Sequence, residues 1–148
     1  MYIKKSDLYY LSGLFDGEES IFITHAKSAS IGTNRKDTYI VCVAVQMIST
    51  YAVKRFQTLF PGMYYTHYKT RTGKPLAYWS RKGQKAIDFL KKIEPFLKEK
   101  KPQALIAMKF KTNKNFINAR LTDKDVNRRK ELRDRIRTLN IKTNHDRD

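Results

Sequence analysis

The stretch LSGLFDGEES at residues 11–20 decides the fold, because in it an apolar helical stripe runs directly into acidic residues and then into a strand. The apolar residues recur at the spacing of one buried helix face, at Leu8, Leu11, Leu14 and Phe15. For this helix, over about residues 7–17, Asp7 suits the N-cap, and Ser6 is the neighbouring candidate. Ser12 and Gly13 leave the backbone bare, so another helix can approach this one closely.

Three carboxylates stand at the end of this helix, on Asp16, Glu18 and Glu19. The helix dipole disfavours anions at a C-terminus. An acid kept at an unfavourable position therefore indicates a function, such as binding a cation. The alternative is a helix stop, in which Gly17 supplies a left-handed cap and solvated acids follow it.

The chain is strongly basic, with 31 Lys and Arg residues against 14 Asp and Glu residues and a formal net charge of +17 in 148 residues. Residues 1–97 carry 15 basic and 7 acidic side chains, and residues 98–148 carry 16 and 7, so the charge follows the whole chain. Such a charge favours a polyanionic partner, and its spread indicates a long DNA footprint. Because ribosomal and other RNA-binding proteins are equally basic, net charge alone leaves DNA and RNA open.

Length and composition predict one folded domain over residues 1–148. A hydrophobic content of 41% and an aromatic content of 12% favour a packed core over disorder. Cys42 is the only cysteine, which excludes an intrachain disulfide and favours a reducing compartment. Because no apolar run is long enough to span a membrane and the first residues lack the apolar core of a secretion signal, we expect an intracellular protein that is not secreted and has no membrane partner.

The rest of the chain alternates between strands and helices. Strands are predicted at about 20–28, 38–47, 64–71 and 76–81, and helices at about 50–60, 83–96, from Pro102 onward, and 122–140. On the second strand one face is apolar, with Tyr39, Val41, Val43 and Val45. The order helix–strand–strand–helix–strand–strand–helix, followed by extra helices, predicts an α+β fold.

The acidic helix end and two later landmarks resemble the LAGLIDADG homing endonucleases. The segment 11–20 is similar to the family signature, with Ser12 where Ala is usual and Glu19 where a small residue is usual. The segment 45–49 resembles the end of the family's second strand, and the segment 94–104 resembles its Pro-Phe-Leu-x-x-Lys-x-x-Gln-Ala element. The resemblance implies the αββαββα fold with an antiparallel, saddle-shaped sheet.

The resemblance covers about residues 6–112, which leaves a basic helical C-terminal extension at about 113–148. Only one signature helix is present, and family members with one copy form homodimers. The implied interface packs this helix against its symmetry mate, through Leu11, Ser12, Gly13, Phe15 and Asp16. Asp16 is interpreted as structural, capping or bridging the paired helices. The alternative is an ordinary buried helix in a monomer.

The resemblance also implies a metal-dependent catalytic site. Glu18 from each subunit and the backbone carbonyl of Gly17 would hold Mg²⁺ at the scissile phosphates. Lys100 matches the family's active-site lysine, which stabilises phosphate charge or polarises the attacking water; its alternative is an exposed helix lysine. Ser49 lies near the position where many members carry a water-organising Gln, a role that passes to solvent or to Gln46 if Ser is too short.

DNA recognition is predicted on the strand faces not used for packing, because a two-stranded ribbon fits the major groove. The predicted DNA-binding residues on the first two strands and their turn are Thr24, Ser28, Ser30, Asn34, Arg35, Thr38, Ile40, Ala44 and Gln46. Those on the second hairpin and after it are Tyr65, His67, Lys69, Arg71, Lys74 and Lys82. Tyr78 and Trp79 leave the facing of the fourth strand open, and the last basic helix contacts phosphates or is simply a solvated charged face.

The expected activity is site-specific cleavage of both strands of a long, nearly palindromic DNA site, leaving short 3′ overhangs. The resemblance implies an origin in a mobile intron of an organelle (chloroplast or mitochondrion) or a microbial genome. Two alternatives stay open on the same fold. One is an intron-RNA splicing maturase that cleaves nothing, which Glu19 keeps open. The other is a DNA-binding regulator whose binding needs no divalent metal and is insensitive to Glu18→Gln.

Overall fold

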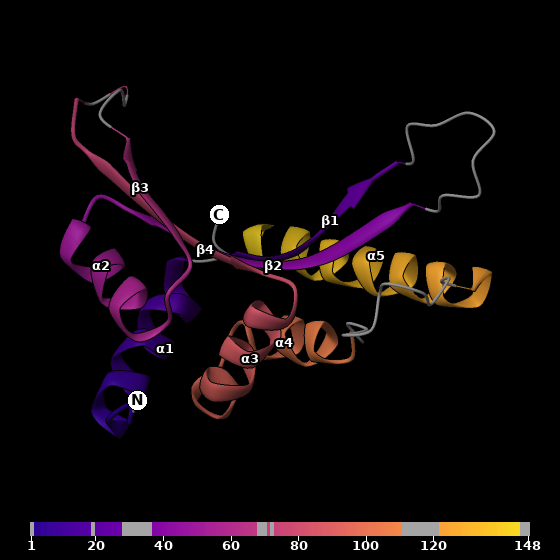
Figure 1. Ribbon diagram of the computed structural model, residues 1–148, viewed down its shortest axis with the longest axis horizontal. Coiled ribbons are helices and arrows are strands. Elements are labelled where there is room, and N and C mark those ends of the chain that lie inside the picture. The colour runs from indigo at the N-terminus through magenta and orange to yellow at the C-terminus, as the bar shows by residue number, and fades with distance from the viewer. Residues whose placement is uncertain are drawn as a thin grey trace.

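A computed structural model describes the chain at residues 2–18, 20–27, 37–67, 71, 73–110 and 122–145, without the side chains of residues 18 and 143–145 (Figure 1). The elements are α1 (Lys5–Glu18), β1 (Ser20–Ala26), β2 (Thr38–Met47), α2 (Thr50–Leu59), β3 (Met63–His67), β4 (Leu76–Lys82), α3 (Gln84–Ile93), the 3₁₀ turn η1 (Glu94–Phe96), α4 (Lys101–Met108) and α5 (Asp123–His145). The predicted α+β order is confirmed.

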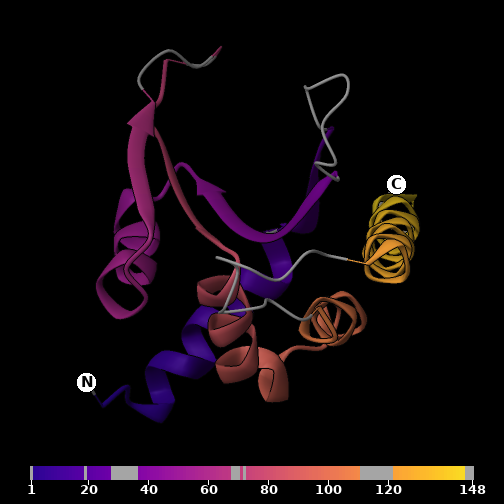
Figure 2. The ribbon, with the colours of Figure 1, turned by 45° about the vertical axis from the view of Figure 1, so that its right-hand side comes forward.

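The four strands form one antiparallel sheet in the order β1-β2-β4-β3. β2 and β4 are the central strands, and Ala44 pairs with both Ser20 of β1 and Ser80 of β4. Figure 2 shows that the sheet curves like a saddle, with all the helices on its outer side and its hollow side left uncovered. One face of each strand therefore belongs to the core, and the other is free for a partner.

The core lies between the outer face of the sheet and the helices. The apolar face predicted for β2 is confirmed, because Tyr39, Val41, Val43 and Val45 are all buried. Trp79 of β4 lies at the centre of an aromatic cluster, where its ring contacts Phe56 and Phe89 and its indole N–H donates to the carbonyl oxygen of Phe60 at 2.9 Å. Burying these side chains supplies the main stabilising free energy of the fold.

The last helix is part of this core rather than an extension of it. Leu132 and Ile136 are buried in the same apolar cluster as the strands, and the Asn140 side-chain amide donates to the backbone oxygen of Ile21 at 3.0 Å. The guanidinium of Arg129 lies 4.9 Å from the centre of the Phe110 ring. The interpretation of residues 113–148 as an extension is thus corrected for α5, which packs along β1 (Figure 1).

Two local predictions also need correction. Asp7 lies inside the first turn of α1 rather than at its N-cap, and its carboxylate accepts from the Arg55 guanidinium of α2 at 2.6 Å. Asp7 therefore forms an ion pair with Arg55 of α2 instead of capping α1. Pro102 is the second residue of α4, not the first. Among the described residues, no helix combines the length and apolar character needed to cross a bilayer.

Candidate catalytic junction and nucleic-acid interface

The carboxylate of Asp16 joins the end of α1 to the turn before α4. Its two oxygens accept the backbone N–H groups of Lys98 at 2.9 Å, Glu99 at 3.0 Å and Lys100 at 2.7 Å. The start of α4 has no side-chain cap of its own at Lys100, so the acid from α1 satisfies donors that precede this helix. Asp16 is structural, as predicted, but it bridges two elements of one chain.

Lys100 is held at the same junction. Its residue surface is only 6% exposed, so it is not the exposed helix lysine of the alternative interpretation. Its backbone is fixed by the Asp16 carboxylate, and α1 continues for two more residues beyond Asp16, through Gly17 to Glu18. Tertiary contacts thus bring two separate sequence landmarks, the acidic helix end and the 94–104 element, to one place.

The helix-stop alternative at Gly17 is wrong, because Gly17 lies within α1 and is not among the glycines with positive φ. The side chain of Glu18 lies outside the described residues, as does Glu19, so the predicted metal ligand stays a prediction. Carboxylate and carbonyl oxygens are the donors that Mg²⁺ prefers, so the donor chemistry of Glu18 and Gly17 fits the expected ion. Within the described residues, no group of three or more His, Cys, Asp or Glu side chains comes together as a metal site.

The two faces of α1 have different roles. Leu11 and Phe15 are fully buried in the chain's own core, where the Phe15 ring contacts Phe89 at 5.2 Å. Burial of these two side chains argues against direct contact with a partner. Leu11 and Phe15 are therefore core residues rather than the interface residues that were predicted. The opposite face carries Gly13 and Gly17, and a Cβ added at either would meet nothing within 4 Å.

Ser12 and Ser49, two further predicted site residues, make local contacts. The Ser12 hydroxyl donates to the backbone oxygen of Leu8 at 2.6 Å and is buried within α1. The Ser49 hydroxyl accepts from the backbone N–H of Ala52 at 3.4 Å and is the N-cap of α2. Ser49 thus has a structural role, and the catalytic role stays a prediction.

The hollow face of the sheet carries the exposed side chains of β1 and β2 that were predicted to contact DNA. Thr24, Thr38, Ile40 and Gln46 are all exposed, and the Thr24 hydroxyl donates to the backbone oxygen of Ile40 at 3.3 Å. The DNA contact predicted at Ala44 is corrected. Ala44 is only 8% exposed, so little of its surface is available to a partner. Cys42 on the same face is also buried, and this burial raises the pKa of its thiol, which favours inert packing.

The second hairpin extends this face. Tyr65 and His67 of β3 are exposed on the hollow side, and the Tyr65 ring stacks on Tyr78 of β4 at a centroid distance of 4.7 Å. The register resolves the facing of β4, which the sequence left open. Tyr78, Ser80 and Lys82 point to the hollow side, because they pair with Gln46, Ala44 and Cys42, while Trp79 points into the core.

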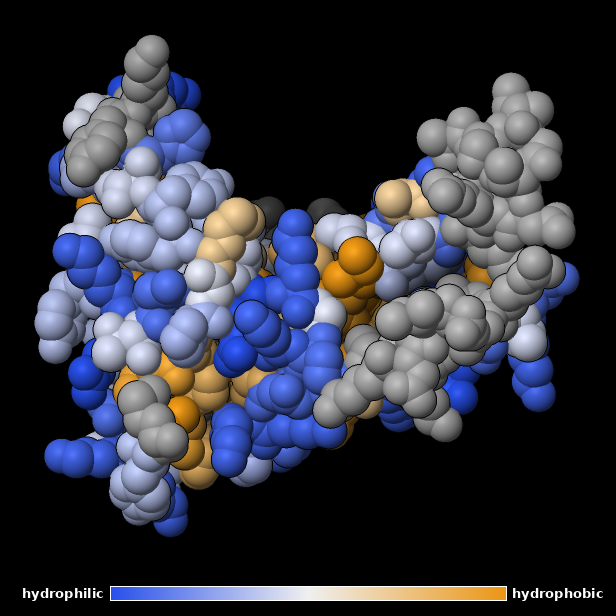
Figure 3. All heavy atoms as spheres, viewed as in Figure 1, coloured by the Kyte–Doolittle hydropathy of each residue, from blue (hydrophilic) through white to orange (hydrophobic). Residues whose placement is uncertain are grey.

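Tyr78 and Ser80 lie on this face but were not among the predicted contacts, because the neighbouring aromatic residues Tyr78 and Trp79 mask the alternation in the sequence. Arg71, Lys74 and Lys82, which are predicted DNA contacts, are all exposed. The predicted contacts that lie outside the described residues are Ser28, Ser30, Asn34, Arg35 and Lys69. Figure 3 shows hydrophilic side chains over much of the view and a hollow between the two arms at the top of the molecule.

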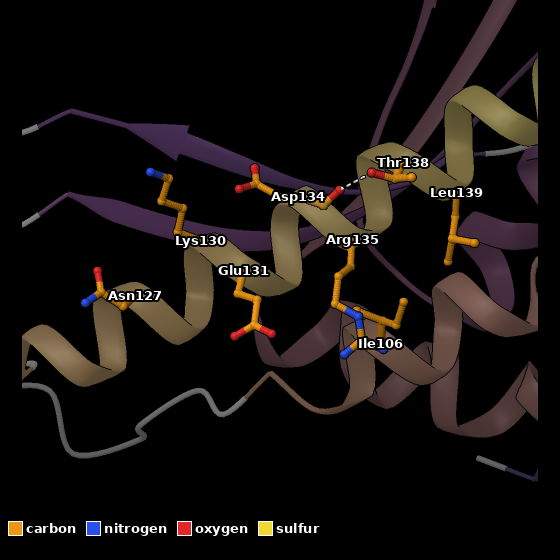
Figure 4. Close-up of a pocket in the computed structure, with 8 residues that line it drawn as sticks. All are labelled: Ile106, Asn127, Lys130, Glu131, Asp134, Arg135, Thr138 and Leu139. Carbon is orange, nitrogen blue, oxygen red and sulfur yellow. Dashed lines mark hydrogen bonds between the residues drawn. The ribbon is translucent and has the colours of Figure 1, made fainter.

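A separate open cavity of about 540 Å³ lies between α4 and α5 (Figure 4). Its charged lining includes both signs, with Lys130 and Arg135 beside Glu131 and Asp134. A hydrogen bond of 3.0 Å from the Thr138 hydroxyl to the backbone oxygen of Asp134 lies on its wall. None of the predicted catalytic or DNA-binding residues lines it.

Comparison with known proteins identifies the fold. No protein-family model and no curated protein matches the sequence. Among solved structures, the homing endonuclease I-CvuI in complex with a DNA target has a TM-score of 0.70 at 16% identity, covering 91% of this chain and 82% of that one. The archaeal intron-encoded homing endonuclease I-Vdi141I, complexed with DNA, has a TM-score of 0.66 at 14% identity, covering 90% and 83%.

A third similar structure is the LAGLIDADG homing endonuclease I-SmaMI bound to cleaved DNA, with a TM-score of 0.59 at 16% identity. The match covers 84% of this chain but 42% of that longer chain. The chain therefore has the fold of the LAGLIDADG homing endonucleases, as the signature at residues 11–20 predicts.

Proposed function

We propose that the chain is a LAGLIDADG homing endonuclease that cuts double-stranded DNA as a homodimer, with a divalent metal. Two observations together carry the proposal. The hollow face of the sheet is uncovered and lined by polar, aromatic and basic side chains, and the same chain joins an acidic helix end to a buried lysine through Asp16. Structurally similar proteins in complex with DNA support the choice of substrate.

The hollow face fits duplex DNA through its shape and its donors. Antiparallel strands can lie in the major groove, where each base pair presents a distinct pattern of donors and acceptors. Gln46 offers the bidentate amide that pairs with adenine, and Thr24 and Thr38 offer hydroxyls. Lys74 and Lys82 are placed for phosphate contacts, which set the register of the protein on DNA without reading sequence.

Dimerisation would use the outward face of α1. Because a side chain on Gly13 or Gly17 would meet nothing in this chain, the helix backbone is open to a second helix. Tyr9 and Tyr10 are exposed on the same helix, with half of their surface available to a partner. An isologous contact through this face would place the two Glu18 residues near one axis and give the two strand cuts that leave 3′ overhangs.

The residues at the junction would have different roles in the hydrolysis of the phosphodiester bond. The Glu18 carboxylate and the Gly17 carbonyl oxygen would bind the metal, and the metal when bound supplies charge stabilisation at the scissile phosphate. Lys100, fixed through its backbone by Asp16, would place a positive charge beside the phosphate or polarise the water that attacks it. Because Lys100 is largely shielded from solvent, its charge acts at lower screening than that of a surface lysine.

The test is cleavage of a randomised duplex DNA library with Mg²⁺ by the wild-type protein and by Glu18→Gln. We expect a recovered site that the wild type cuts in both strands and the variant binds but does not cut. Asp88→Asn is the matched control, because it removes one negative charge from an exposed position on α3 away from the junction. This control should cut like the wild type, and sedimentation of the uncut complex should give two protomers per site.

Each other outcome removes part of the proposal. Sequence-specific binding with no cutting by the wild type would replace the endonuclease with a DNA-binding regulator. Weak, salt-sensitive DNA binding without a preferred site, together with tight binding of structured intron RNA, would favour the maturase alternative. Cutting that survives Glu18→Gln would overturn the assignment of the metal ligand.

A further inference from the structure

Two side-chain amides link β1, α5 and α4 inside the molecule. The Asn140 amide of α5 donates from Nδ2 to the backbone oxygen of Ile21 in β1 at 3.0 Å. Its Oδ1 accepts from Nε2 of Gln103 on α4 at 3.4 Å. The three elements also contact one another pairwise, so these bonds run through a packed region. Ile21, Asn140 and Gln103 are called the amide relay below.

The amide relay lies among apolar side chains. Gln103 is only 1% exposed and Asn140 is half-buried, while Ile136, one turn before Asn140 on α5, is fully buried. A buried amide costs free energy unless its hydrogen bonds are made. Because these bonds are directional and apolar contacts are not, the amides fix the relative positions of β1 and α4 more narrowly than leucines of similar size would.

The direction of the amide relay is set from the backbone. A peptide oxygen only accepts hydrogen bonds, so the amino group of Asn140 must face Ile21. The oxygen of the same amide then faces α4, where it accepts the amino group of Gln103. A flip of the Asn140 amide would place its oxygen against the Ile21 oxygen. Asn140 therefore contacts β1 and α4 at the same time through two different atoms.

Both ends of the amide relay lie close in the chain to the predicted catalytic residues. Ile21 is the second residue of β1, which begins just after the acidic end of α1 that carries Glu18. Gln103 lies one helical turn after Lys100, and residues at this spacing share one face of a helix. Lys100 and Gln103 are accordingly both buried. Asp16 holds the backbone at Lys100 from α1, and the amide relay holds the following turn from β1.

We propose that Asn140 is a positioning residue, which holds the strand that follows Glu18 at a fixed place relative to the helix that follows Lys100. The inference rests on the proposed function, because that function gives Glu18 and Lys100 their roles. Catalysis of hydrolysis requires the charge of Lys100 and the carboxylate of Glu18 to meet one phosphate, and small misplacements of such groups slow an enzyme strongly. Asn140 acts on both through the backbone.

The variants separate the two bonds of Asn140. Asn140→Asp keeps the size of the side chain and the acceptor for Gln103, but it places an oxygen where the donor to Ile21 stood. Asn140→Leu removes both bonds. Ile136→Val is the matched control, because it removes one buried methylene from the same helix and leaves the amides in place. It should lower the stability of α5 packing by a similar amount.

The first measurement is amide hydrogen exchange on the full chain, without DNA or metal. The reporter is the Lys100 amide, which donates to Asp16 on the far side of α4 from Asn140's own bonds, and its rate is taken relative to the core amide of Val43. Asn140→Leu should speed this exchange about fivefold, the factor for one hydrogen bond of ordinary net strength. Ile136→Val should leave the ratio at its wild-type value.

The second measurement is single-turnover cleavage of the recovered DNA site at saturating DNA and Mg²⁺. Asn140→Leu and Asn140→Asp should each lower the rate about tenfold or more while the affinity for uncut DNA is retained, because only the geometry of the junction has changed. Gln103→Leu should have a similar effect. The double variant Gln103→Leu with Asn140→Leu should be no slower than either single variant, since both interrupt one relay. Ile136→Val should cut like the wild type.

The outcomes distinguish this inference from the nuclease itself. Unchanged exchange at Lys100 in Asn140→Leu would overturn the link between β1 and α4. Equal effects of Ile136→Val would make Asn140 an ordinary packing residue. Faster exchange with an unchanged cleavage rate would overturn its role in positioning the catalytic residues. A wild type that cuts no DNA would overturn the proposed function, and the exchange ratios would then decide alone whether Asn140 holds α4 in place.

Discussion

The two faces of the same four strands follow different rules. On the outer face Val41, Val43, Val45 and Trp79 are fully buried, so the packing of the surrounding side chains limits the size and shape of each. On the hollow face Ile40 is 38% exposed, and Gln46 and His67 are also exposed, with no helix covering this face (Figure 2). On the proposed function, one sheet thus separates stability from recognition. Changes on the outer face should affect folding, whereas changes on the hollow face should affect binding.

The largest effect should come from Trp79→Ala, compared with Tyr65→Ala on the hollow face. Trp79 is fully buried, and its loss would remove its ring contacts and its hydrogen bond to Phe60. We expect a loss of about 3–5 kcal/mol in unfolding free energy. Tyr65→Ala should cost less than about 1 kcal/mol, because Tyr65 is exposed and loses only surface ring contacts, with Tyr78 and His67. Urea denaturation of both variants measures the two losses in unfolding free energy. Equal losses would contradict the claim that only the outer face determines stability.

The substitution Asp16→Asn should have an effect of intermediate size. It should lower both the stability of the chain and its cleavage activity. The neutral amide has one acceptor oxygen where the carboxylate uses two for three backbone N–H groups. Losing these charge-assisted bonds should destabilise the chain by about 1–3 kcal/mol. If Lys100 is catalytic, cleavage at saturating DNA should also fall while the affinity for DNA is retained. Single-turnover cleavage, measured below the melting temperature of the variant, tests this. A proportional loss of affinity would instead indicate general unfolding.

Gln46→Ala should affect recognition with little effect on folding. Gln46 is exposed on the hollow face and pairs with Tyr78 across the strands. We expect the preference for one base in the recovered site to weaken by about 1–2 kcal/mol, with the unfolding free energy nearly unchanged. Competition binding against the four single-base variants of that position measures the preference. Thr58→Ala, an exposed change on α2, is the control and should leave the preference intact.

The smallest effect concerns the start of α5. The Asp125 carboxylate accepts from the Thr122 hydroxyl at 2.8 Å and from its backbone N–H at 3.1 Å. These bonds lower the pKa of Asp125 below its ordinary value of 3.8. Because the folded pKa is the lower one, the stabilisation is present above 3.8 and is lost as the pH falls through the folded pKa. The thermal midpoint of the wild type should therefore approach that of Asp125→Asn below this range, with no change in DNA affinity at pH 7. A constant difference between the two proteins at every pH would contradict it.

Much of the fold could be predicted from local patterns. The alternation in β2 predicts its buried face, because side chains in a strand point to opposite sides. The break at Pro61 and Gly62 predicts the end of α2. The sequence pattern predicts strand ends at residues 28 and 71, whereas β1 ends at Ala26 and β3 at His67. The helix at 122–140 was found, but it continues to His145.

The candidate site depended on contacts that no local pattern contains. Asp16 accepts hydrogen bonds from backbone groups 82 to 84 residues away, and only the packing of α1 beside η1 brings them together. The burial of Lys100 follows from the same packing. Leu132 and Ile136 are two apolar positions in a highly charged helix, which is why the sequence suggested a solvated extension.

The amino-acid sequence by itself determined the order of the elements, the apolar face of β2 and the acidic end of α1, because each depends on residues close together in the chain. Tertiary structure alone decided which face of β4 is hollow, which side of α1 is open, and which distant groups meet at Asp16. These depend on strand register and helix packing, in which a shift of one residue moves a side chain from the core to the surface.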